Sequence, residues 1–174
     1  MKKKLIVTSL LAASVFASAA NAAIGKITIT GSVTATPCEV AINNGATGST
    51  HSLTMPNIFG QDIPMTAGPI NKELPFKIEL TGCPKSAKNA EIKFTGTANG
   101  ADIALQDSGK TNDTIVLNIL KNGSEYNIGT TDIQTITNGI ATFDYTLKYK
   151  TTKPRADVKP GDLTAALDYE ITYN

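Results

Sequence analysis

The final stretch of the sequence, residues 162–174, alternates between apolar and polar side chains. The apolar positions are Leu163, Ala165, Leu167, Tyr169, Ile171 and Tyr173, and the residues between them are polar apart from Ala166. A period of two predicts a β-strand with one face in a core and the other in water. Such a strand needs a neighbour on each edge, because its N–H and C=O groups otherwise lack partners. Because this strand is the last segment of the sequence, we expect no later segment to pair with it.

A second alternating segment lies near the other end. One face carries Ile27, Ile29, Gly31 and Val33, and the opposite face carries Lys26, Thr28, Thr30, Ser32 and Thr34. We therefore expect both ends to form sheet, and either could pair within one molecule or between two.

Residues 1–22 have the features of a signal peptide. Lys2 to Lys4 form a basic start, and Leu5 to Phe16 form an apolar stretch that is short for a bilayer. Ala20-Asn21-Ala22 fits the small-x-small cleavage rule, which predicts export and a mature chain that begins at Ala23. An uncleaved anchor is the disfavoured alternative. No later segment is apolar enough to predict a transmembrane segment.

Charge and motifs argue against nucleic-acid binding and catalysis. The chain has 16 Lys+Arg and 15 Asp+Glu; loss of the leader, with three of the lysines and no acid, leaves 13 against 15, a net charge of −2. No basic patch predicts a nucleic-acid partner. The sequence has one histidine, His51, and none of the common hydrolase, metalloprotease or phosphate-loop motifs. We predict a single domain with no enzymatic activity, cofactor or metal.

The two cysteines, Cys38 and Cys83, are predicted to form a disulfide, since an exported chain matures under oxidising conditions. A closed loop of this length stabilises the fold by roughly 4 kcal/mol in the chain-entropy model. A reactive dithiol or a metal site is the alternative, and the absence of a CxxC arrangement disfavours it.

Short strands and turn signals predict an all-β fold. Asn-Gly pairs at 44–45, 99–100, 122–123 and 138–139 suit the tight turns of hairpins. Residues 43–52, 56–69 and 151–161 are predicted to be irregular, and 56–69 to follow a sheet edge. A sandwich is favoured over a barrel. The strands expected between the two alternating ends are 74–80, 90–95, 114–121, 124–128, 133–137 and 140–150.

The order of several features resembles one protein family. The alternating residues 25–33 are followed by Pro37-Cys38-Glu39-Val40, and Phe76-x-Ile78-x-Leu80-Thr81-Gly82-Cys83 carries the second cysteine. Gly161 is fourteenth from the end and Tyr173 is penultimate. Together these features resemble the type 1 fimbrial subunits, the pilins of chaperone–usher pili.

The resemblance implies an incomplete immunoglobulin-like β-sandwich that lacks its seventh strand. It implies a signal peptide over residues 1–22, an N-terminal donor-strand extension over 23–36 and a pilin domain over 37–174. It also implies that the disulfide joins the first two strands of that domain. The implied donor face is Ile27, Ile29, Gly31 and Val33. The implied acceptor groove and C-terminal strand contain Gly161, Leu163, Leu167, Tyr169, Ile171 and Tyr173.

The implied partners are a periplasmic chaperone, an outer-membrane usher and neighbouring fimbrial subunits. The chaperone would fill the groove with its own strand and anchor the C-terminal carboxylate of Asn174. At the usher, the extension of the next subunit would replace that strand. The expected result is a head-to-tail polymer, exported through the periplasm to the cell surface as a fimbria that supports adhesion.

A self-complete exported β-sandwich that binds carbohydrate, or an adhesin module, is the alternative function. Adhesins that resemble this family usually carry an extra N-terminal binding domain and begin without a donor strand. This sequence has the donor pattern and room for one domain, so a structural subunit is favoured.

Overall fold

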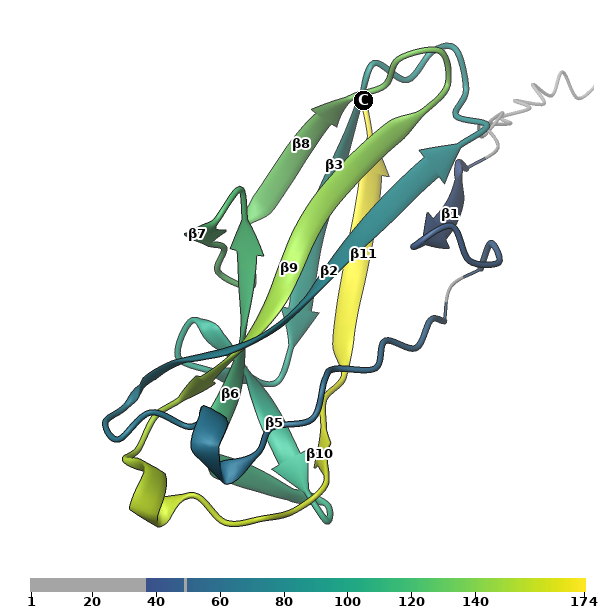
Figure 1. Ribbon diagram of the computed structural model, residues 1–174. Helices are drawn as coiled ribbons and strands as arrows, with labels where there is room; N and C mark the ends of the chain where they lie inside the picture. The colour runs from purple at the N-terminus through teal and green to yellow at the C-terminus, as the bar shows by residue number, and fades with distance from the viewer. Residues whose placement is uncertain (1–36, 49) are drawn as a thin grey trace, which may run out of the picture. The chain divides into compact units, whose positions relative to one another are not determined.

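The computed structural model describes residues 37–48 and 50–174, and these form two antiparallel β-sheets (Figure 1). The predicted leader, the extension and its donor face of Ile27, Ile29, Gly31 and Val33 lie outside the described residues. Within the described part, no helix has the length and apolar character needed to cross a membrane.

The larger sheet has the strand order β1-β2-β9-β6-β5-β10, and two short strands extend it, β4 beside β5 and β7 beside β6. Its strands are β1 (Glu39–Ile42), β2 (Gly68–Thr81), β4 (Ala98–Asn99), β5 (Asp102–Asp107), β6 (Lys110–Lys121), β7 (Ser124–Glu125), β9 (Ala141–Thr151) and β10 (Leu163–Thr164). The smaller sheet has the order β11-β3-β8. Its strands are β3 (Asn89–Gly96), β8 (Thr131–Thr135) and β11 (Leu167–Tyr173). Two single turns of 3₁₀ helix, η1 (Gly60–Asp62) and η2 (Arg155–Asp157), lie in the irregular segments.

The core lies between the inward faces of the long strands. On β9, Phe143, Tyr145, Leu147 and Tyr149 alternate with polar residues, and none of the four is more than 7% exposed. The ring of Tyr145 meets that of Phe94 on β3 edge to face, with centroids 5.0 Å apart. Period-two alternation therefore assigns the faces of these strands as predicted.

Two predicted hairpin turns are present. Asn122 and Gly123 have φ values of 52° and 78°, and Asn138 and Gly139 have 54° and 78°. Both central residues of a type I′ turn need positive φ, which Asn and Gly tolerate better than other residues. The first turn joins β6 to β7, and the second precedes β9.

The predicted disulfide is present and links the first two strands. Cys38 directly precedes β1 and Cys83 follows the end of β2, with Cα atoms 4.4 Å apart. The strands themselves pair, with Glu39 opposite Thr81. The bond therefore fastens the start of β1 to the end of β2.

The C-terminal segment, predicted as one alternating strand, is broken into two strands in the structure. β10 pairs with β5 in the larger sheet, whereas β11 pairs with β3 in the smaller one. Ala165 and Ala166 belong to neither strand. The backbones of Gly96 and Ala166 approach closely at the point where the chain passes from one sheet to the other. A Cβ on Gly96 would lie 3.1 Å from the Ala166 carbonyl oxygen. The segment thus changes sheets instead of running as one strand.

The predicted strand over 124–128 is also shorter in the structure, where β7 ends at Glu125. The Tyr126 amide still donates to the Ile119 carbonyl, at 2.7 Å. The Tyr126 ring packs into the core, 5.5 Å from that of Tyr145, and the chain turns at Gly129, whose φ is 85°. The inward packing of the Tyr126 ring and the turn at Gly129 therefore end the pairing of β7 with β6 before residue 128.

Candidate strand-acceptor groove

The apolar face of the last strand is incompletely covered. Four apolar side chains of β11 are only partly buried, although they pack against the core; they are Leu167, Tyr169, Ile171 and Tyr173. The inward residues of β9 are buried throughout. β11 pairs along its whole length with β3, and among the described residues no strand pairs with its other edge. One edge of β11 therefore presents main-chain groups beside a half-buried apolar face.

A groove of about 1090 Å³ runs beside this edge. The first wall is formed by residues of the irregular segment 50–63, and the second wall by residues of the segment 158–169. Residues 56–69, predicted to follow a sheet edge, contribute part of the first wall. The floor reaches the core itself and is formed by Phe76, Ile78, Phe94, Ile103, Leu105, Ile115, Leu117, Leu147 and Tyr149.

Residues 50–63, the first wall, lack a strand but have local order at η1. The Phe59 amide donates to the Asp62 carboxylate, at 2.8 Å, and the Asp62 amide donates to the Phe59 carbonyl, also at 2.8 Å. The Lys72 ammonium on β2 lies 3.5 Å from the same carboxylate. The Phe59 ring is 58% exposed at the groove.

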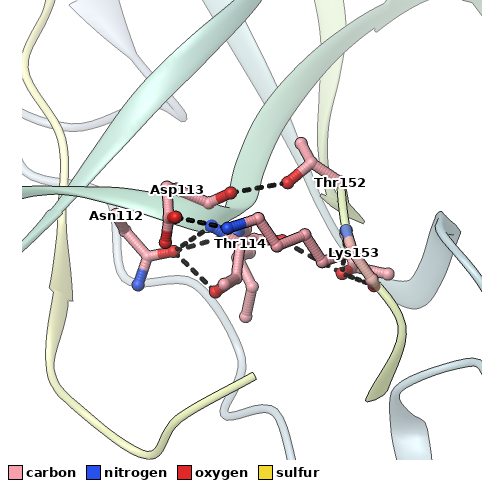
Figure 2. Close-up of polar contacts among 7 residues, drawn as sticks. Asn112, Asp113, Thr114, Thr152 and Lys153 are labelled. Atoms are coloured by element: carbon pink, nitrogen blue, oxygen red, sulfur yellow. Dashed lines mark hydrogen bonds and ion pairs between the residues drawn. The ribbon is translucent and has the colours of Figure 1, made fainter. Parts of the chain in front are cut away.

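The second wall begins after a cluster of polar contacts at the end of β9. The Asn112 side-chain oxygen accepts bonds from the amides of Thr114 (2.9 Å) and Ile115 (2.8 Å). The Thr152 hydroxyl donates to the Asp113 carbonyl, at 2.8 Å, and Lys153 pairs with the Asp113 carboxylate (Figure 2). These contacts lie where the chain leaves β9, ahead of the second wall.

Gly161 lies directly against the Asp107 side chain. A Cβ at this position would overlap the Asp107 carboxylate. The adjoining residue pair, Leu163 opposite Asp107, joins β10 to β5. Glycine therefore allows the second wall to lie closely against β5.

The predicted acceptor residues divide into two groups. Gly161, Leu163, Leu167 and Tyr169 line the groove. Ile171 and Tyr173 lie on the same face of β11 but beyond the lining. Burial raises the pKa of Tyr169. Burial also raises the pKa of Tyr173, and a hydrogen bond with the Cys38 backbone opposes that shift, which places the end of β11 beside the disulfide.

Asn174, the predicted chaperone anchor, is held by the start of β3. Its main-chain oxygen accepts bonds from the amides of Lys88 (2.6 Å) and Asn89 (3.0 Å), and its own amide donates to the Asn89 carbonyl at 3.1 Å. Its side-chain nitrogen donates to Glu91 at 2.9 Å. These bonds fix the position of the chain end, while its role as an anchor stays a prediction.

Some residues of the groove were not identified from the sequence. Among the floor residues, Ile103 lies on β5, which was not predicted as a strand. Leu117 lies on β6, whose apolar pattern indicates only a buried strand. His51 lines the groove, and its Nε2 lies 2.9 Å from the Gly48 carbonyl oxygen. Within residues 37–48 and 50–174, no three His, Cys, Asp or Glu side chains gather as a metal site.

Comparison with known proteins gives one consistent result. Residues 27–174 match the sequence profile of a family described as fimbrial protein. The major fimbrial subunit SMF-1 of Stenotrophomonas maltophilia is 31% identical over 90% of this chain and 96% of its own length. The fimbria A protein of Serratia marcescens is 27% identical over 98% and 97%.

Solved structures show the same fold. The P pilus rod subunit PapA superposes with a TM-score of 0.60 and 21% identity, over 80% of this chain and 100% of that one. The Burkholderia pseudomallei antigen and type I fimbria protein BPSL1626 gives a TM-score of 0.54 and 28% identity, over 80% and 91%.

Proposed function

Because the chain belongs to the fimbrial protein family and is a structural, non-enzymatic subunit of a fimbria, we propose that it polymerises by donor-strand exchange. In this proposal, residues 23–36 of one copy fill the groove beside β11 of the next. One observation carries it: β11 is paired on one edge only among the described residues, and its apolar face is half-buried. An added strand would complete both the sheet and the core.

The inserted strand has the side chains that such a groove requires. Ile27, Ile29 and Val33 would each gain about 1.5–3 kcal/mol on burial, before the cost of ordering the segment. Main-chain hydrogen bonds along the free edge of β11 would add to this. Gly31 would allow the two backbones to approach closely where the groove is shallow.

The polymer follows from the geometry of the contact. A groove on one copy and an extension on another form a heterologous pair, which propagates head to tail. The resemblance to known fimbrial subunits further supports cleavage of residues 1–22 and a pilin domain over 37–174. It also supports a periplasmic chaperone that occupies the groove first and anchors Asn174, and release at an outer-membrane usher.

The place of the subunit in the fimbria is proposed from its relatives. One relative is named a major fimbrial subunit, and the fold is that of a pilus rod subunit. We place this chain in the repeating shaft, with adhesion supported by the fimbria as a whole.

The test compares two neighbouring substitutions in the extension, Ile29→Lys and Thr28→Lys. They add the same charge to opposite faces of the predicted strand. Polymer formed by strand exchange should resist SDS and collapse to monomer on boiling. Ile29→Lys is expected to abolish the SDS-resistant ladder and leave chaperone binding intact, and Thr28→Lys to keep the ladder. A normal ladder from Ile29→Lys would contradict the donor assignment.

Deletion of residues 24–33 separates the proposal from the self-complete sandwich. The deleted subunit is expected to fold with the chaperone, accept a strand and end polymer growth, since it has a groove and no donor. Unfolding of the deleted chain in the presence of chaperone would instead assign the segment to its own domain.

A further inference from the structure

Arg155 connects the two walls of the groove. It lies in η2, just before the second wall, and its Nε donates a 2.6 Å hydrogen bond to the carbonyl of Ile63. Its Nη2 donates to the carbonyl of Gln61, at 3.4 Å. Ile63 is buried and lines the groove, so the contact fastens the end of the first wall to the start of the second.

No other polar contact has this position. Within the described part of the chain, no further hydrogen bond or ion pair joins residues 50–63 to residues 155–169. Asp62 is tied to β2 through Lys72, and Gly161 is packed against Asp107 on β5. Each wall is thus held to the sheet behind it, and Arg155 holds the walls to each other.

The chemistry of the contact suits arginine in particular. The two acceptors are main-chain carbonyls two residues apart, and the planar guanidinium presents several N–H donors in a fixed fork. Arg155 is partly buried and Ile63 is buried, so loss of the fork would leave the Ile63 carbonyl without its donor. Lysine has one ammonium group on a flexible stem and offers no such geometry.

We propose that Arg155 is a positioning residue that sets the separation of the groove walls and thereby holds a single inserted β-strand in place. The inference rests on the proposed strand exchange. Arg155 does not line the groove, so it acts through the wall segments and not by contact with the inserted strand. Its loss should increase the rate at which a bound strand leaves, since changes at an interface act mainly on dissociation.

The experiment starts from the full chain in complex with its chaperone, and a labelled synthetic peptide of residues 23–36 is added to replace the chaperone strand in the groove. Release of the peptide is followed in an excess of unlabelled peptide, at a temperature below the unfolding transition. Arg155→Gln is expected to release the peptide about tenfold faster than wild type, the effect of losing one charge-assisted hydrogen bond. Arg155→Lys should fall between the two.

Lys153→Gln is the matched control. Lys153 lies in the same loop and pairs with Asp113 on β6 (Figure 2). It should release the peptide as wild type does. Before the peptide is added, the unfolding midpoint of the chaperone-bound subunit is measured by circular dichroism. It should be similar for Arg155→Gln and Lys153→Gln. A purely structural role for Arg155 would instead lower that midpoint in Arg155→Gln alone.

The outcomes distinguish this inference from the proposed function. Equal release from wild type and Arg155→Gln, or faster release that parallels a lowered midpoint, would overturn the role of Arg155 and leave strand exchange intact. Failure of the wild-type subunit to take up the peptide at all would overturn strand exchange and this inference with it.

Discussion

The hydroxyl of Tyr145 donates a 2.7 Å hydrogen bond to the carboxylate of Asp132, and this bond joins the two sheets. Tyr145 lies on β9 of the larger sheet and Asp132 on β8 of the smaller one. Asp132 is only 4% exposed, and Lys121 on β6 pairs with its second carboxylate oxygen. A buried carboxylate is tolerated here because both of its oxygens are bound.

Asp132→Ala should therefore destabilise the domain strongly. Removing one partner of a buried ionic cluster typically costs about 3–5 kcal/mol, because the remaining groups are left without partners. The measurement is urea unfolding followed by circular dichroism. Asp113→Ala is the matched control, since Asp113 pairs with Lys153 at the surface (Figure 2). Equal midpoints for the two variants would show that the Asp132 cluster contributes nothing to stability.

High pH should unfold the domain through its tyrosines. Burial and the nearby Asp132 charge raise the pKa of Tyr126 to about 12. Burial and the hydrogen bond to Asp132 also raise the pKa of Tyr145. The folded state therefore binds these protons more tightly than the unfolded state, whose tyrosines titrate near 10. The stability they contribute is complete below about pH 10 and is lost as the pH rises toward 12.

The check is a titration that follows phenolate absorbance and circular dichroism together. All five tyrosines have a raised pKa in the fold, so absorbance and unfolding should change in one step. Tyr126→Phe should lose less stability over the same interval, because one titrating group is gone. Phenolate absorbance that rises near pH 10 while the fold stays intact would contradict the prediction.

Loss of the disulfide should lower the stability of the whole domain. In Cys38→Ser the closed loop between residues 38 and 83 is opened, which costs roughly 4 kcal/mol in the chain-entropy model. We expect lower chaperone capture and lower yield of the subunit. The double variant Cys38→Ser/Cys83→Ser should behave alike, which separates loss of the bond from effects of a free thiol. Wild-type yield from either variant would make the bond dispensable.

The features that the sequence predicted correctly are those encoded locally. The inward positions of β9, from Phe143 to Tyr149, follow from alternation alone, because side chains on a strand point to opposite faces in turn. The disulfide followed from two cysteines in an exported chain. That the disulfide joins the first two strands followed from the family resemblance.

The features that were missed depend on partners far away in the sequence. The alternation lapses only at Ala166, and a single alanine does not predict a change of sheet, which depends on the positions of β5 and β3. Arg155 stands in a predicted loop without periodicity, and its acceptors are main-chain carbonyls whose identity leaves no pattern. Sequence alternation predicted the apolar face of β11, and not the contact between Arg155 and residues 61–63.

The acceptor face of β11 is tested by Leu167→Lys and Thr172→Lys. Both variants add a lysine to the same strand, but Leu167 lines the groove and Thr172 points to solvent. Leu167→Lys replaces apolar contact worth about 1.5–3 kcal/mol with a charge that an inserted strand would bury. We expect it to bind chaperone weakly and to form no SDS-resistant ladder, while Thr172→Lys assembles normally.

Leu167→Ala is the control for misfolding in this comparison, because it shortens the side chain without adding a charge. It is expected to fold and to form a ladder that collapses at a lower temperature than the wild-type ladder. Circular dichroism of each chaperone-bound subunit establishes that the domain is folded before assembly is scored. A ladder from Leu167→Lys with wild-type heat resistance would show that β11 does not receive the inserted strand, and the groove would then need another occupant.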